Sequence, residues 1–205
     1  MINNEMLCEM MNSLLDKIEN AEDELEFEKA FREILKLAEQ GIPEAQYNVG
    51  YLMYMNPDLF GDDANQDAAL WFKKASDAGI PEAQRYLGQM YRDGEGVDRN
   101  IEEAIRLLSL ASEHDLPYAQ SALAHIYYFE KYGHVDKAKA YLWYSQAAMH
   151  GEGEAQYILG KMYYEGDLVP KNWKLALEFL EPALWKGYAD SRRIIEEIKA
   201  SLKSR

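Results

Sequence analysis

The residues that could carry out chemistry in this sequence are few and scattered. Four histidines occur, none at the short spacings typical of zinc ligands: His114, His125, His134 and His150. His114 and His150 fall where the last turns of two helices are expected, so we interpret them as cations that favour the helix dipole. The sequence has no His-Glu-x-x-His, Gly-x-Ser-x-Gly or paired-cysteine motif. We therefore predict no catalytic site, no metal and no cofactor.

Cys8 is the single cysteine, which excludes an intramolecular disulfide and favours a reducing, cytoplasmic location. No basic residue lies near it in the sequence to activate the thiol. We expect Cys8 to pack as a small hydrophobic side chain.

Two glycine-containing segments, residues 93–97 and 165–170, could be mistaken for phosphate-binding loops. No strand is expected before them, no Gly-Lys-Ser/Thr follows, and their acidic side chains would repel phosphate. We interpret both segments as turns.

Composition and charge restrict the class of partner. The 205 residues are 48% hydrophobic, enough for a substantial core, and no stretch approaches 18 consecutive apolar residues. The formal net charge is -14, from 36 acidic and 22 basic residues, which disfavours nucleic acid and anionic membranes as partners. Residues 1–30 alone carry nine acids against two lysines, and residues 58–67 carry four aspartates. A basic protein partner is favoured.

The dipeptide Ala-Gln recurs with its alanine at positions 45, 83, 119 and 155, which gives spacings of 38, 36 and 36 residues. Five residues after each alanine comes a small residue, and eight after it a large one. The small residues are Gly50, Gly88, Ala124 and Gly160. A glycine in a helix costs roughly 1 kcal/mol against alanine, so we expect a neighbouring helix to approach closely at these positions.

A second pattern alternates with the first: an alanine, large residues three and four later, a second alanine or its substitute (Leu37 in the first copy) at seven, and a glycine at eleven. Its five copies begin at Ala30, Ala68, Ala104, Ala140 and Ala176. Positions i, i+3, i+4 and i+7 share one face of a helix, and a glycine just beyond them is a typical helix end. Two copies depart from the pattern, at Glu33 and Asp115. Pro43, Pro81 and Pro117 then open the following helices.

These patterns predict two alternating sets of helices. We expect A helices near 43–54, 81–92, 117–130, 153–164 and 189–202, and B helices near 24–40, 64–78, 100–113, 135–150 and 172–186. Residues 3–18 should form one more helix. The predicted fold is all-α, a right-handed superhelical solenoid of helix-turn-helix hairpins with a period of about 36 residues. We expect one domain over residues 1–205, with a capping helix in 1–22, repeats over 24–187 and a C-terminal capping helix in 188–205.

The two patterns combine into one longer motif, which runs from Ala83-Gln84 through Gly88 and Tyr91 to Ala104 and again from Ala155-Gln156 through Gly160 to Ala176. This motif resembles the Sel1-like repeat family. The resemblance covers about residues 24–190. It implies a superhelix related to tetratricopeptide arrays and a role as an interaction adaptor, and some bacterial members resemble immunity proteins that neutralise a toxic effector. A cysteine-rich branch has reported penicillin-binding activity, which the single cysteine here does not support. The third repeat departs from the family, with Ala124 for glycine and residues 128–133 in place of the glycine loop.

In each A helix, the positions two, six and nine residues after the repeat alanine do not follow the repeat pattern. They lie together on the side of the helix opposite to the repeated positions. We call these residues the A-helix face: Tyr47, Tyr51, Tyr54, Arg85, Gln89, Arg92, His125, Tyr128, Tyr157, Lys161 and Tyr164, with Ser121 in the same register. Tyrosine and arginine are enriched among residues that dominate binding energy at protein interfaces. In hairpin solenoids the A helices line the concave face, so this is the predicted binding surface; the alternative is that the tyrosines pack between repeats.

Together these observations predict a non-catalytic protein-binding module, with a toxin or effector domain as the candidate basic partner. Two alternatives stay open. One is a general adaptor scaffold in signalling or assembly, and the other is a hydrolase like those of the cysteine-rich branch. The sequence does not indicate the oligomeric state.

Overall fold

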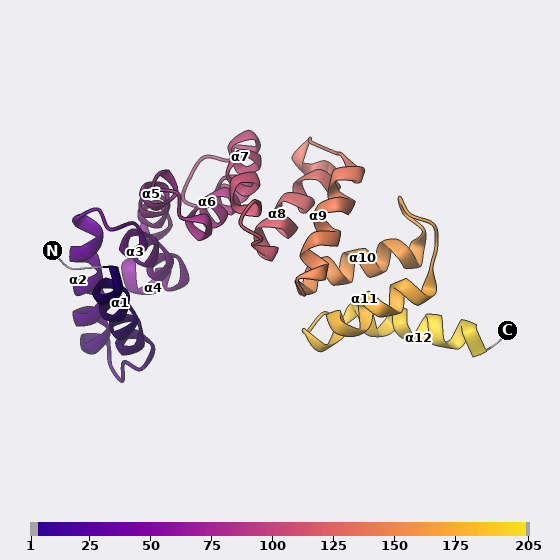
Figure 1. Cartoon of the computed structure of the whole chain (residues 1–205), viewed down its shortest axis with the longest axis horizontal. Coiled ribbons are helices and arrows are strands. Elements are labelled where there is room, and N and C mark those ends of the chain that lie inside the picture. Colours follow the sequence, from indigo (N-terminus) through magenta and orange to yellow (C-terminus); the bar gives the residue numbers. More distant parts are fainter. Residues whose placement is uncertain (1–3, 204–205) are drawn as a thin grey trace. The chain divides into compact units, whose positions relative to one another are not determined.

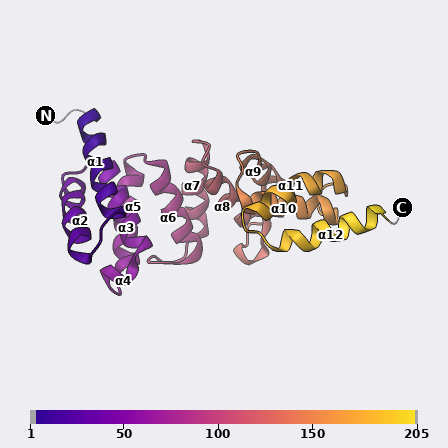
Figure 2. The ribbon, with the colours of Figure 1, turned by 90° about the horizontal axis from the view of Figure 1, so that it is seen from below.

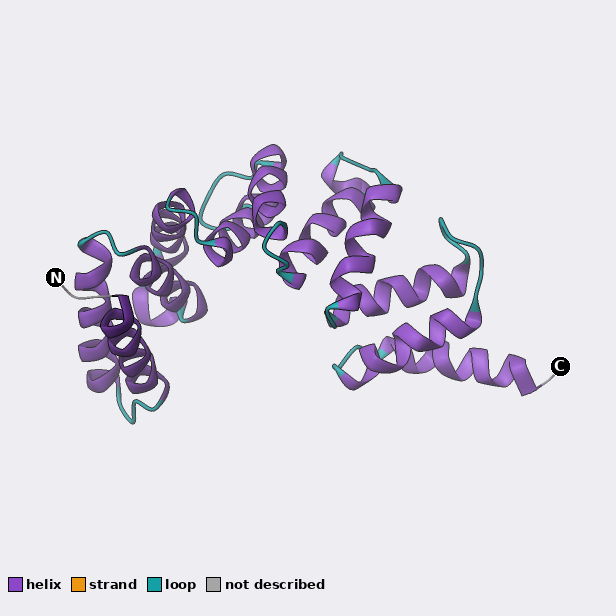
Figure 3. Ribbon diagram, viewed as in Figure 1, coloured by secondary structure: helices purple, strands orange, loops and turns teal. Residues whose placement is uncertain are grey.

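A computed structural model describes residues 4–203, and every regular element in that range is a helix (Figure 3). Contacts divide the chain into two compact units, Met1–Asn100 and Ile101–Arg205. Unit 1 holds the helices drawn in indigo to magenta in Figure 1. They are α1 (Asn4–Glu19), α2 (Glu24–Glu39), α3 (Pro43–Met55), α4 (Pro57–Phe60), α5 (Ala64–Asp77) and α6 (Pro81–Asp93).

Unit 2 continues the alternation of helices. It holds α7 (Ile101–Ser112), α8 (Pro117–Tyr128), the 3-10 turn η1 (Glu130–Tyr132), α9 (Lys137–Met149), α10 (Gly153–Glu165), α11 (Trp173–Trp185) and α12 (Asp190–Lys203). Within each unit, helices that follow one another along the chain pack against each other. The all-α class and the helix-hairpin repeat are thereby confirmed, while the expectation of one solenoid domain over residues 1–205 stays a prediction.

The predicted helices agree with the observed ones except in two loops. The third A helix, expected to reach residue 130, ends at Tyr128, and η1 follows it. The short helix α4 was not expected, and it fills the first loop between an A and a B helix. The expected first residue of α1, at position 3, lies outside the described residues.

The turns from B to A helices use the left-handed backbone conformation that the glycine pattern predicts. Gly41, Gly79, Gly151 and Gly187 have φ between 82° and 95°. Asp115 occupies the equivalent place in the third repeat with φ 53°, so it takes the same conformation without glycine's freedom. Proline is then the first residue of α3, α6 and α8, where a missing amide donor costs nothing.

The glycines inside the A helices mark close contacts with the next helix, as expected. A Cβ added to Gly50 would lie 2.9 Å from a ring carbon of Phe72 and 3.2 Å from the carbonyl oxygen of Ala68, both on α5. At Gly160 it would lie 2.7 Å from Cγ of Leu180 on α11. The helix propensity lost at glycine is thus offset by tighter packing of A against B helices.

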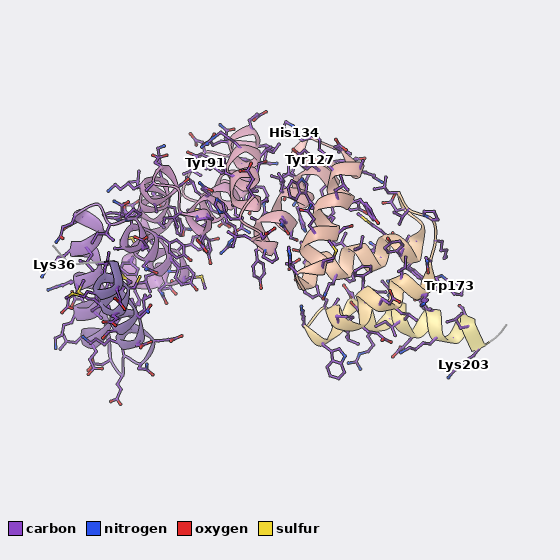
Figure 4. The ribbon with its side chains drawn as sticks, viewed as in Figure 1. Lys36, Tyr91, Tyr127, His134, Trp173 and Lys203 are labelled. Carbon is purple, nitrogen blue, oxygen red and sulfur yellow. The ribbon has the colours of Figure 1, made fainter. Side chains whose placement is uncertain are left out.

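One backbone hydrogen bond closes the loop between A and B helices in three hairpins. The N–H groups of Asn100, Asp136 and Asn172 donate to the carbonyls of Tyr91, Tyr127 and Tyr163, at 2.9, 2.8 and 2.9 Å. Figure 4 labels Tyr91 and Tyr127, the acceptors in two of these loops. The third hairpin therefore closes as the others do, although η1 and Gly133 (φ 77°) replace its glycine loop.

The conserved spacing of Ala-Gln also has a structural basis. The repeat alanines at 45, 83, 119 and 155 are fully buried. The side-chain amide of Gln46 donates to the carbonyl of Ala38, and that of Gln156 to the carbonyl of Ala148, both at 3.2 Å. The glutamine therefore ties the start of an A helix to the end of the preceding B helix.

Helix α1 packs on α2 through Met11 and Leu14, but Cys8 is exposed, so the expectation that it packs as a small hydrophobic residue was wrong. Met6 of α1 is exposed as well, so α1 leaves one side to solvent. No described helix is long and apolar enough to cross a membrane.

Candidate functional site

The A-helix face is half-buried in both units. Each of its eleven residues lies on α3, α6, α8 or α10 and has an intermediate exposure, neither buried nor open to solvent. Ser121, in the same register, is buried instead. The structure thus keeps eleven of the twelve positions at the surface and removes one.

In unit 1 the tyrosines of α3 gather around Tyr86 of α6. The ring centroids of Tyr47, Tyr51 and Tyr54 lie 6.2, 5.6 and 5.6 Å from that of Tyr86. Tyr86 also stacks on Phe72 of α5, with centroids 5.1 Å apart and planes 5° from parallel. One side of these rings therefore packs between repeats, which supports the packing interpretation for part of each side chain.

The polar members in unit 1 are held beside this aromatic cluster. The guanidinium carbon of Arg85 lies 3.7 Å from the centre of the Tyr86 ring, a cation–π contact, and Arg85 donates to the Gln89 side chain at 3.1 Å. Arg92 forms a bidentate pair with the neighbouring Asp93, at 2.5 and 2.9 Å. The face thus presents aromatic rings bordered by ordered polar groups.

The tyrosines nine residues after the repeat alanine share a bonding pattern. Each hydroxyl donates to a carboxylate of the following hairpin or helix: Tyr54 to Glu95 at 2.9 Å, Tyr128 to Asp167 at 3.0 Å, and Tyr164 to Glu197 at 2.6 Å. The Lys137 ammonium adds a second donor to Asp167 at 2.9 Å. These hydrogen bonds hold the hydroxyls of Tyr54, Tyr128 and Tyr164 in place and put a carboxylate beside each of them.

The remaining members in unit 2 also have neighbours. Tyr157 stacks on Tyr188 with centroids 6.0 Å apart, and Lys161 pairs with Glu165 at 3.7 Å. Nε2 of His125 lies 3.0 Å from Oε1 of Glu154, close enough for an ion pair when the ring is protonated but not aligned as a hydrogen bond.

Burial and these carboxylates keep the phenols protonated. Desolvation is the larger cause and the acidic partner the second in raising the pKa of Tyr54 and of Tyr128 to about 12. Desolvation also raises the pKa of Tyr47 to about 12. The hydrogen bond from Lys137 is the main reason that the pKa of Asp167 lies below its usual range. At neutral pH the face therefore carries neutral hydroxyls beside ionised carboxylates.

Sequence reasoning missed Tyr86 and the acidic partners. Tyr86 lies three residues after its repeat alanine, outside the register of the A-helix face, so only the contacts reveal it as the centre of the cluster. The carboxylates are 33 to 41 residues from the tyrosines they bind, a separation that no local pattern reports.

Among the residues that the structure describes, no three histidine, cysteine or acidic side chains gather as metal ligands would. His134 lies 3.5 Å from Glu102 as a single pair. His150 is the cap residue just beyond α9, and α7 ends at Ser112, two residues before His114, so neither histidine lies in the last turn of its helix as expected.

Among curated proteins, NMB1327 of Neisseria meningitidis serogroup B, which is named as uncharacterized, is 27% identical over 190 residues, covering 79% of this chain and 40% of its own length. The chitin synthase regulator SKT5 of Saccharomyces cerevisiae is 27% identical over 186 residues, covering 85% and 26%. An exopolysaccharide production negative regulator of Rhizobium meliloti is 28% identical over 134 residues, covering 60% and 48%. The chain thus spans less than half the length of each of these relatives.

Solved structures share the fold. A Sel1 repeat protein from Oxalobacter formigenes superposes with a TM-score of 0.72 at 28% identity, over 89% of this chain and 71% of that one. The immunity protein Pa5087 from Pseudomonas aeruginosa superposes with a TM-score of 0.58 at 21% identity, over 93% and 69%, a likeness of fold.

The family model for the Sel1 repeat matches four consecutive segments, residues 43–80, 81–116, 117–152 and 153–184. Each segment begins at or beside the first residue of an A helix and contains the B helix that follows. With these matches covering most of its length, the chain belongs to the Sel1 repeat family, whose members are protein-interaction scaffolds.

Proposed function

We propose that this chain is a non-catalytic module that binds a basic partner protein through the A-helix face. The observation that carries the proposal is the composition of that face: positions that the repeat leaves free hold half-buried tyrosine, arginine, lysine and histidine side chains in both units. Such large amphipathic side chains, already ordered by their neighbours, lose little conformational entropy on binding.

Charge supports a basic partner. Glu95, Asp167 and Glu197 each accept a hydrogen bond from a tyrosine of the face, so a carboxylate lies beside the face once in unit 1 and twice in unit 2. The net charge of -14 would attract a cationic protein over a distance and accelerate its association at low salt.

Our specific candidate for the partner is a toxin or effector domain that the chain neutralises in the cytoplasm. An acidic inhibitor that covers a basic domain uses both the steering and the buried aromatic contacts described above. The exposed thiol of Cys8 is compatible with a reducing compartment, where a free cysteine stays reduced.

A second candidate is a general adaptor in signalling or assembly. It is favoured by the names of two relatives at 27% and 28% identity, which are regulators of chitin synthase and of exopolysaccharide production. An adaptor would recruit several proteins, whereas an inhibitor would hold one basic domain in a fixed ratio.

An affinity capture from native lysate, read by mass spectrometry, tests the proposal. Gln89→Lys places a cation on the face beside Arg85, and Gln66→Lys adds the same charge at an exposed position on α5, outside the face. We expect a basic protein to be captured by the wild type and by Gln66→Lys, and recovery to fall at least about fivefold with Gln89→Lys, a change of about 1 kcal/mol. Equal recovery by both variants would show that the face does not bind it, and an acidic partner would overturn the charge argument.

A further inference from the structure

The first loop between an A and a B helix departs from the repeat and builds a feature that the repeat does not require. The spacing between the first two Ala-Gln dipeptides is two residues longer than the others. In place of the left-handed glycine that caps α6 and α10, Asn56 caps the carboxyl end of α3 and is followed by α4, residues 57–60. Figure 2 shows α4 following α3 at the lower edge of unit 1.

Helices α2 and α4 together line an apolar groove of about 320 Å³. Its aromatic wall is formed by Phe27, Phe31 and Phe60. The Phe31 and Phe60 ring centroids lie 4.8 Å apart, and Phe27 lies 6.2 Å from each of them. Leu35 and Leu59 complete the apolar lining. This volume lies at the lower end of the range of about 300–1,000 Å³ that is typical of ligand pockets.

Leu35 and Leu59 are apolar at positions where the repeat pattern does not require it, although Leu35 also packs partly against the core of unit 1. Leu35 lies five residues after the alanine that opens its B-helix pattern, and the other four B helices carry polar residues there: Lys73, Ser109, Ser145 and Glu181. Leu59 is 51% exposed on α4, at a position that a polar side chain could equally occupy. Apolar residues that converge on one exposed groove are typical of an interaction site.

The rim of the groove is acidic. Glu24 and Glu28 line it from α2, with Arg32 paired to Glu28 at 2.6 Å, and Asp58 precedes Leu59 on α4. The surrounding chain strengthens this potential, since residues 1–30 carry nine acids against two lysines. An apolar floor inside an acidic rim is complementary to an amphipathic cationic segment.

We propose that the α2–α4 groove binds a basic amphipathic segment of a partner protein, with leucine or phenylalanine anchors in the groove and flanking lysines or arginines on its rim. The proposal deepens the proposed function, on which it rests for the nature of the partner. The groove is nevertheless a second surface, made by α2 and α4, whereas the A-helix face in unit 1 is made by α3 and α6.

Fluorescence anisotropy with the full chain and labelled 12-residue probe peptides tests this groove. One probe carries leucines spaced for one helix face with lysines elsewhere, and a second has glutamates in place of the lysines. We expect the lysine probe to bind and the glutamate probe not to bind. Leu59→Ser should weaken the lysine probe at least fivefold, and Glu24→Lys should weaken it and reduce its salt dependence.

Leu25→Ser is the matched control, because Leu25 is 55% exposed on α2 and does not line the groove. It should leave the affinity unchanged, as should Gln89→Lys on the A-helix face. Equal affinity for wild type and Leu59→Ser, or equal binding of both probes, would overturn the groove proposal. Since capture of the partner through the A-helix face is measured separately, failure of one proposal is distinguishable from failure of the other.

Discussion

At the scale of single residues, the tyrosines of the A-helix face combine packing with polar anchoring. The rings of Tyr47, Tyr51 and Tyr54 pack around Tyr86, and the hydroxyls of Tyr54, Tyr128 and Tyr164 are held by carboxylates. The same side chains therefore pack between repeats and remain partly exposed on the A-helix face. A substitution to alanine would remove both, so the hydroxyl and the ring must be tested separately.

The hydroxyl of Tyr128 is tested by Tyr128→Phe, which removes its 3.0 Å bond to Asp167 and leaves the ring. A hydrogen bond to a charged group contributes about 1.5–3 kcal/mol, and because this pair is partly exposed we expect the unfolding free energy to fall by about 1 kcal/mol. Urea unfolding measures it. In a double-mutant cycle with Asp167→Asn the two losses should not add; simple additivity would show that the pair is not coupled.

Alkaline pH should weaken the fold through the same tyrosines. The pKa values of Tyr47, Tyr54 and Tyr128, about 12, lie above the ordinary value of 10.0, so the stability that these three contribute is fully present below pH 10 and is lost as the pH rises towards 12. We expect the urea midpoint to fall between pH 10 and 12 while tyrosinate absorbance rises late. Tyr128→Phe should reduce this dependence, and a midpoint unchanged from pH 10 to 12 would contradict the burial of the phenols.

At the scale of elements, glycine and alanine spacing determines how closely A and B helices approach. Gly160→Ala would gain helix propensity but place a methyl group 2.7 Å from Cγ of Leu180, and overpacking typically costs about 1–3 kcal/mol. We expect a net loss of stability in urea unfolding. Ala124→Gly, at the equivalent place in the third repeat, should cost about 1 kcal/mol from helix propensity and about 0.8 kcal/mol more from the loss of a buried methyl group. A more stable Gly160→Ala protein would show that the contact is not tight.

At the turn formed by Asp115, a substitution by glycine is expected to increase stability. Its φ of 53° is a left-handed conformation that costs L-residues about 1–2 kcal/mol, less for aspartate, and that glycine adopts freely. We expect Asp115→Gly to raise the unfolding free energy by up to about 1 kcal/mol, with Gly151→Ala (φ 82°) lowering it. Loss of stability in Asp115→Gly would indicate that the aspartate side chain stabilises the turn.

Most of the fold could be predicted from sequence because each turn and each close contact requires a particular residue type. Pro81 and Gly79, for example, mark a helix start and the turn before it within three residues. Helix α4 could not be predicted, since four residues carry no periodicity. The register of the A-helix face was predictable, whereas its bonds to Glu95, Asp167 and Glu197 depend on how successive hairpins pack.

At the scale of the whole molecule, the chain combines an acidic character with surfaces of two kinds. The A-helix face presents ordered aromatic and polar side chains in each unit, and the α2–α4 groove adds an apolar site in unit 1. We propose that both bind a cationic protein, and the four matched repeats identify the scaffold that carries them. The decisive observation is therefore which surface of the chain a partner contacts.

Hydroxyl-radical footprinting of the chain, with and without the captured partner, measures that directly. Trp185 and Met149, 90% and 74% exposed on B helices, serve as internal references outside the A-helix face. The proposed function predicts that the partner lowers oxidation of Tyr47, Tyr51 and Tyr157 and leaves both reference residues unchanged. Protection of Trp185 and Met149 with the A-helix tyrosines unchanged would contradict it and place the binding surface on the B helices.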